Sequence, residues 1–256
     1  MKNKKSKQQN FIGLCLIISV VLVFIGLFGI FAYTKFSVKD ITQYNVFLID
    51  ATDNLNPQQK GELLNKFNAY IDASPKNAWH EFYKVGPTES GLLVPLVKAK
   101  SAFAKEEQHN YLTANPSLLK IALKKHFEEP LKAALNEAFQ SPEAKSSPIL
   151  ESIQSVAITC LRKPDALKTQ KRLILVSNLM QNTESINFYK GIPEYKNIKS
   201  LDAFRTKLIG LEGVDFEIWL LNPRLLETQE QKLLMLWNEI INGQGAQKVK
   251  VVKIAG

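Results

Sequence analysis

Histidine and cysteine are scarce in this chain of 256 residues. The three histidines, His80, His109 and His126, show no metal-ligand spacing and no neighbouring cysteine, whereas a zinc site needs several nitrogen or sulfur ligands. His80 is expected at the surface of a strand. Cys15 lies in an apolar N-terminal run, so Cys160 has no partner for an internal disulfide and the redox compartment is not readable. Cys160 is expected to be a core thiol.

Several motifs that carry chemistry are also missing. The chain has no G-x-S-x-G elbow, no Walker lysine loop and no G-x-G-x-x-G stretch. The net charge of +9 includes the N-terminal lysines, and the remaining cations form no arginine-rich block and are not interleaved with aromatics. A nucleic-acid footprint would be more concentrated, so no nucleic-acid partner is expected. An enzymatic active site has no positive support in the sequence.

Charge is absent from residues 11–33 (FIGLCLIISVVLVFIGLFGIFAY). About 20 apolar residues span a bilayer, so this run predicts a transmembrane helix. A cleaved signal peptide is the alternative, but its apolar part would be shorter and would end in small residues. Four lysines precede the run and two follow it closely. The positive-inside rule then predicts a cytoplasmic N-terminus (1–10) and an extracytoplasmic C-terminal domain, as in a periplasmic inner-membrane protein of bacteria.

After a tether over 34–43, apolar runs alternate with helical patterns through residues 44–256. Strands are predicted at 44–50, 78–86, 91–99, 171–179, 214–223 and 247–256. Helices are predicted at 56–74, 115–139, 146–161, 200–213 and 227–246. This alternation indicates an α/β fold, a Rossmann-like, doubly wound, mostly parallel six-stranded sheet covered on both faces.

Individual residues refine this fold. Asn56 is a good N-cap, Pro57 fits the first turn of a helix, and Gln59 completes a capping box. Pro95 cannot donate to a sheet ladder, so its strand should lie at an edge of the sheet. Pro130 should kink or divide the long helix at 115–139.

Polar clusters lie at three places in this order of elements. Asp50, Thr52 and Asn54 stand in "DATDN" after the first strand, Ser147 precedes Pro148 in "SSPILESI", and Asn178 follows a strand in "LVSNL". The order of elements and these clusters resemble the von Willebrand factor A domain. That resemblance implies that the edge strand with Pro95 is antiparallel to its neighbour. It also implies a metal-ion-dependent adhesion site built from the three loops, here in a degenerate form.

The resemblance implies that Asp50, Thr52, Asn54, Ser147 and Asn178 bind Mg²⁺ or Mn²⁺ through oxygen ligands. Asn178 stands where the family has an aspartate, so one negative charge is missing; Asp53, inside the loop, is the residue that could compensate. Each residue also has a local explanation without an ion, because Asp50 and Thr52 can satisfy loop amides and Ser147 can cap a helix.

Two functions follow as expectations. The first is a membrane-anchored binding or scaffold protein that presents its strand-end face to a membrane-associated partner protein, as a component of a bacterial membrane complex. The second is an envelope enzyme that uses Asp50 and Asp53 as acid and base carboxylates. A deep pocket at Asp50 with a neighbouring cation or histidine would favour the enzyme.

Overall fold

The computed structural model describes residues 19, 21–26, 41–52, 55–87, 91–101, 115–140, 145–207, 210–222 and 224–254. The chain divides into two compact units, Met1–Asp40 and Ile41–Gly256. The second unit contains a sheet whose strands are β1 (Gln43–Ile49), β2 (Trp79–Lys84), β3 (Pro95–Lys100), β4 (Gln170–Ser177), β5 (Val214–Leu220) and β6 (Lys248–Lys253).

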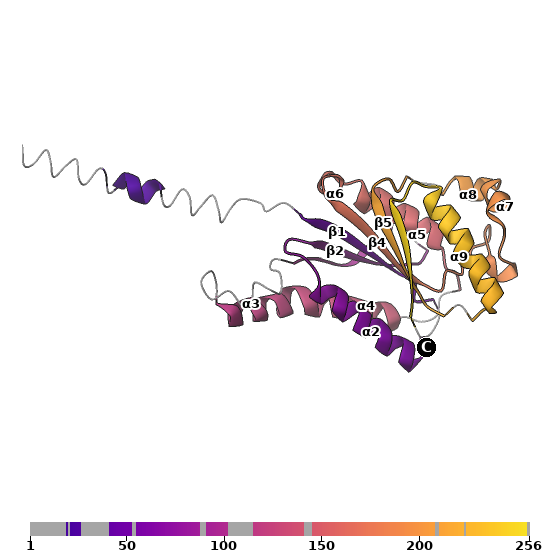
Figure 1. Ribbon diagram of the computed structural model, residues 1–256, viewed down its shortest axis with the longest axis horizontal. Coiled ribbons are helices and arrows are strands. Elements are labelled where there is room, and N and C mark those ends of the chain that lie inside the picture. The colour runs from indigo at the N-terminus through magenta and orange to yellow at the C-terminus, as the bar shows by residue number, and fades with distance from the viewer. Residues whose placement is uncertain are drawn as a thin grey trace, which may run out of the picture. The chain divides into compact units, whose positions relative to one another are not determined.

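The sheet has six strands in the order β3-β2-β1-β4-β5-β6 (Figure 1). All neighbours pair in parallel except β2 and β3, which are antiparallel. Pro95 is the first residue of edge strand β3, where a missing N–H costs no ladder hydrogen bond. The predicted mixed sheet with one antiparallel edge strand is therefore confirmed.

Helices cover both faces of the sheet, as the alternation of elements predicted (Figure 1). The longer ones are α2 (Pro57–Asp72), α3 (Pro116–Leu123), α4 (Glu129–Gln140), α5 (Ile149–Val156) and α9 (Glu227–Asn242). Short helices are α6 (Pro164–Leu167), α7 (Tyr195–Lys199), α8 (Asp202–Arg205) and the 3₁₀ turn η4 (Phe188–Lys190). One core joins the sheet to α2 and α4, and the other joins it to α5 and α9. The predicted helix at 200–213 is shorter in the structure, because α8 ends at Arg205.

Local sequence signals shape the helices on the first face. The Asn56 side chain accepts from the Gln59 amide at 2.8 Å, and the Gln59 side chain accepts from the Asn56 amide at 3.1 Å, so the predicted capping box is confirmed. Before Pro130 the helix widens into the π-helical turn η2 (Lys124–Glu128), where the Glu129 amide donates to the Lys124 carbonyl. Proline offers no amide and crowds the preceding turn, which divides the helix as predicted.

The predicted transmembrane helix over 11–33 needs correction. Among the residues that the structure describes, no helix is long and apolar enough to cross a membrane. Within that run the structure describes Ser19 and residues 21–26. The other residues of the run, and residues 34–40 of the tether, lie outside the described residues. The expectation of a single-pass membrane protein loses its basis with this helix.

The strand order creates a topological switch point between β1 and β4. The chain leaves β1 through α2 toward β2, and it leaves β4 toward β5 on the opposite side. The two loops therefore diverge at the carboxyl ends of adjacent central strands. In open α/β sheets, ligands bind in the crevice that such diverging loops leave.

Candidate functional site

Asp50 lies at this switch point and is almost completely buried, with 3% of its surface exposed. Its amide donates to the Val176 carbonyl at 2.8 Å, which continues the β1–β4 ladder. One carboxylate oxygen accepts from the Thr52 hydroxyl at 2.8 Å and the Thr52 amide at 3.3 Å. The other accepts from Ser177 at 2.7 Å and Ser147 at 3.0 Å. Three separate segments of the chain thus meet at one carboxylate.

Two opposing effects act on the Asp50 carboxyl group. Burial raises its pKa above the ordinary value, while the hydrogen bonds from Ser177, Thr52 and Ser147 lower it, and burial has the larger effect. Four accepted hydrogen bonds occupy about all of the lone-pair positions of a carboxylate. Asp50 is therefore a saturated, rigidly held group rather than one with free coordination sites.

The structure brings most of the predicted site residues together. Asp50, Thr52 and Ser147 are hydrogen-bonded to one another, and Asn178 lines the same cavity as Asp50. The Asn178 side chain accepts from the Met180 amide at 2.9 Å. Asn54, together with its neighbour Asp53, lies outside the described residues. The convergence of the three loops is confirmed, and metal binding by them stays a prediction.

Ser147 does not cap a helix, contrary to the local explanation considered from the sequence. Helix α5 begins at Ile149 after Pro148 and has no side-chain cap from its own first residues. The Gln181 side chain accepts from the Leu150 amide at 3.0 Å and serves that end of the helix. The Ser147 hydroxyl is thereby available for Asp50, so its position reflects the polar centre and not the capping of α5.

A small cavity of about 20 Å³ opens beside Asp50. Its described lining residues are Asp50, Thr52, Leu55, Gln59, Asn178, Leu221, Asn222 and Arg224. Such a volume holds roughly one water molecule. Arg224, in a left-handed conformation with φ 54°, contributes the cation among these residues.

These residues fit a divalent cation poorly. The hydroxyls and the Asn178 amide oxygen are hard donors of the kind that Mg²⁺ prefers. Against binding, the Asp50 carboxylate already accepts four hydrogen bonds, and a cationic residue, Arg224, is among the residues that line the same cavity. In the part of the chain that the structure describes, no group of three or more His, Cys, Asp or Glu side chains is placed to hold a metal ion.

A larger cavity of about 220 Å³, here called the side cavity, adjoins Ser147 through Pro148. Helix α5, the segment after β2 and the residues before β3 form most of it, with Glu151, Ser152, Ser155 and Leu93 among its lining residues. The buried Ser152 hydroxyl, with 2% of the residue exposed, has no hydrogen-bond partner among the described residues. A buried polar group without a partner costs about 1–3 kcal/mol, so it marks a position that a ligand could satisfy.

Away from the switch point, the sheet buries a second carboxylate, Glu81, which no sequence pattern predicted. Glu81 on β2 accepts from Tyr44 and Tyr83 at 2.5 Å each, from Trp79 at 2.9 Å and from Lys163 at 3.2 Å. Burial alone would raise the pKa of Glu81, but these hydrogen bonds outweigh burial and lower it to about 2. Parallel register places Tyr44, Trp79, Glu81 and Tyr83 on one face of the sheet.

Cys160, from the π-helical turn η3 (Ala157–Leu161), packs against this network. Its sulfur lies 3.0 Å from the Tyr83 hydroxyl and 3.4 Å from the Glu81 carboxylate. The thiol is fully buried, and burial raises its pKa. A thiolate is the reactive form of cysteine, so the predicted core thiol is confirmed.

His80 was predicted at the surface, and this prediction is wrong. The residue is completely buried on the opposite face of β2, where its ring packs edge-on against Phe127 at 5.1 Å between centroids. Its Nε2 lies 3.3 Å from the Ser74 hydroxyl, and its Nδ1 has no partner among the described residues. Burial lowers the pKa of His80 to about 3. The alternation of side chains along the strand could not predict that the helical segment α3–η2–α4 covers this face of the sheet.

The sequence matches no protein-family model and no curated protein.

Proposed function

We propose that this chain is a von Willebrand A-like binding module that recognises an acidic side chain of a partner protein at its strand-end face, without a metal ion. The observation that carries the proposal is the position of Arg224 at the Asp50 cavity. In the family that the sequence resembles, a bound cation meets an acidic partner group. Here Arg224 supplies a positive charge at the corresponding place.

The Asp50 centre supports this role by holding the three loops still. Its hydrogen bonds connect the loop after β1, the segment before α5 and the end of β4. A preorganised surface loses less conformational entropy when it binds, and this gain adds directly to affinity. Asp50 in this proposal is a positioning residue, and Arg224 makes the contact with the partner through a charge-assisted hydrogen bond.

The side cavity provides a second contact on the same face. Its volume of about 220 Å³ has room for one side chain of a partner segment. Ser152 would offer that side chain a buried hydrogen bond, and Leu93 would offer apolar contact. An acidic group at Arg224 and a neighbouring side chain in the side cavity together define a short linear recognition motif.

The enzyme alternative has less support. It required a deep pocket at Asp50 with a neighbouring cation or histidine. Arg224 supplies the cation, but a cavity of about 20 Å³ has no room for a substrate. The described lining of that cavity contains no second carboxylate, and Asp53 lies outside the described residues.

A random peptide library displayed on phage tests the proposal without a known partner. The library is selected against the full chain, and the selected peptides are then measured by fluorescence anisotropy. We expect them to share Asp or Glu and to bind at least tenfold more weakly to Arg224→Glu, since a charge reversal replaces attraction by repulsion. The control is Arg162→Glu, an exposed arginine at the end of η3.

Binding measurements in EDTA distinguish recognition without a metal ion from recognition through a bound ion. Undiminished affinity in EDTA, together with loss in Arg224→Glu, supports metal-independent recognition. Binding that disappears in EDTA and returns with Mg²⁺ would contradict it. Peptides that bind Arg224→Glu as well as the unmodified chain would refute recognition at this face.

A further inference from the structure

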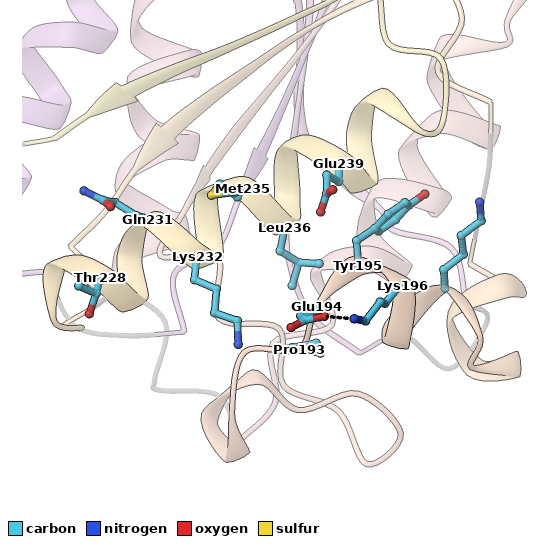
Figure 2. Close-up of a pocket in the computed structure, with 11 residues that line it drawn as sticks. Pro193, Glu194, Tyr195, Lys196, Thr228, Gln231, Lys232, Met235, Leu236 and Glu239 are labelled. Atoms are coloured by element: carbon cyan, nitrogen blue, oxygen red, sulfur yellow. Dashed lines mark ion pairs between the residues drawn. The ribbon is translucent and has the colours of Figure 1, made fainter.

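A groove of about 590 Å³ lies between α7 and α9, and its described lining residues differ from those of the Asp50 cavity. Figure 2 shows Leu236 and Glu239 projecting from α9 toward the segment that carries Pro193 and Glu194. The volume lies within the range of about 300–1,000 Å³ that small-molecule sites occupy. The groove is therefore large enough for a ligand of drug size, which the Asp50 cavity is not.

Apolar atoms form much of the groove. Leu236 is buried beneath it, whereas Met235 on the same helix has 68% of its surface exposed. Pro193 and the Tyr195 ring add apolar surface from the opposite side. An exposed methionine beside a buried leucine and an aromatic ring is a surface on which a flat or extended apolar group gains free energy by displacing water.

The charged residues of the groove favour an anion. Three lysines, Lys196, Lys199 and Lys232, face two acids, Glu194 and Glu239. Lys196 pairs with Glu194 at 2.8 Å, and the Lys199 ammonium lies 5.8 Å from the centre of the Tyr195 ring. Figure 2 shows Lys232 reaching into the same space from α9. With the Lys196–Glu194 pair neutral, two cations and one carboxylate remain around the apolar surface.

We propose that this groove is a binding site for an organic anion with an apolar body, such as an aryl or alkyl carboxylate. The apolar body lies on Leu236, Met235 and the Tyr195 ring. The anionic end meets Lys232 and Lys199, where it gains charge-assisted hydrogen bonds. Glu239 opposes the anion and sets a limit on affinity. The inference is independent of the function proposed for the Asp50 centre.

Two small probes with the same apolar body and opposite charge test this site. 4-Phenylbutyrate and 4-phenylbutylamine are titrated into the full chain, and binding is followed by calorimetry and by backbone amide NMR shifts. We expect 4-phenylbutyrate to bind saturably and to shift amides of α7 and α9. The amine should bind at least tenfold more weakly, because the two lysines repel its positive charge and only Glu239 attracts it.

Two groove variants that change the charge in opposite directions test the role of the lysines. Lys232→Glu should weaken 4-phenylbutyrate binding at least tenfold, whereas Glu239→Gln should strengthen it. Lys168→Glu, at an exposed lysine outside the groove, and Arg224→Glu should leave it unchanged. Equal binding of the amine, shifts outside α7 and α9, or an unchanged affinity in both groove variants would overturn the proposal. The Arg224→Glu arm keeps this outcome separate from that of the Asp50 centre.

Discussion

The buried ionisable side chains of the domain respond to opposite dominant forces. At Glu81, hydrogen bonds from Tyr44, Tyr83, Trp79 and Lys163 exceed the cost of burying the charge. At Asp50 and His80, burial is the larger effect. The His80 ring packs edge-on against the Tyr70 and Phe127 rings, and its Nδ1 has no hydrogen-bond partner among the described residues, so it has little to stabilise a proton. The surroundings of Glu81 therefore favour its charged form, whereas those of Asp50 and His80 favour their neutral forms.

Acid should destabilise the fold in two steps, of which the first belongs to His80. Its pKa is about 3 in the folded chain and about 6.5 in the unfolded chain, so the unfolded chain binds more protons between these values. The contribution of neutral His80 to the free energy of unfolding is therefore fully present above about pH 6.5 and is lost as the pH falls toward 3. Glu81, with a folded pKa of about 2 against an ordinary 4.5, adds its loss only below about pH 4.5.

Urea denaturation at a series of pH values measures the first step. From pH 6.5 to 4.5 we expect His80 to remove about 2–3 kcal/mol from the free energy of unfolding. The variant His80→Gln, of similar volume and without a titrating ring, should lack this loss. Asp50, whose raised pKa acts in the opposite direction, is the same in both proteins. Parallel stability curves for the two proteins would rule out His80 as the cause.

At the scale of elements, the two edges of the sheet are protected differently. Edge strand β3 begins with Pro95, which cannot donate to an added strand. Edge strand β6 has the sequence KVKVVK, in which all three lysines are exposed. Lys250 also reaches Glu217 on the neighbouring strand at 3.5 Å. Charged side chains along a free edge prevent edge-to-edge pairing between molecules.

Replacing Lys250 by valine should therefore cause association. The variant Lys250→Val creates four consecutive valines on an unpaired edge, a pattern that favours strand addition. We expect it to elute as larger species in size-exclusion chromatography with light scattering, while the thermal midpoint at low concentration stays close to that of the unmodified chain. The matched control Lys250→Arg retains the charge and should behave like the unmodified chain. Normal elution of Lys250→Val would show that this lysine does not guard the edge.

At the scale of the whole molecule, both hydrophobic clusters are formed by residues of the unit Ile41–Gly256. The clusters lie on opposite faces of one sheet, and every strand contributes to at least one of them. A fold in which one sheet joins both cores should unfold in a single cooperative transition.

A chain that starts at Ile41 should therefore fold on its own. We expect it to retain the circular dichroism of a mixed α/β protein and to unfold in one urea transition with the same midpoint and slope as the full chain. The full chain, measured under identical conditions, is the control. A lower midpoint would show that residues 1–40 stabilise the domain, and a second transition would show that the two cores unfold separately.

Local signals predicted much of this fold. Apolar periodicity placed the strands and the inward face of α9, where Leu233, Leu236, Trp237, Ile240 and Ile241 are all buried as expected. Asn56 and Pro95 were placed correctly because a cap or an edge depends on the residue and its nearest neighbours. The membrane prediction relied on hydropathy alone, and in the residues that the structure describes no helix meets the required length.

The sequence by itself determined the order of strands and helices, because short-range periodicity and capping encode each element separately. Its resemblance to the von Willebrand factor A domain also indicated that Asp50, Ser147 and Asn178 would meet. Only the tertiary structure decided that Ser177 joins the Asp50 centre, that Arg224 stands at its cavity, and that Glu81 is buried with its donors. These contacts join residues that are far apart in the chain. They depend on how the crossover connections place the strands and helices, which no local sequence pattern encodes.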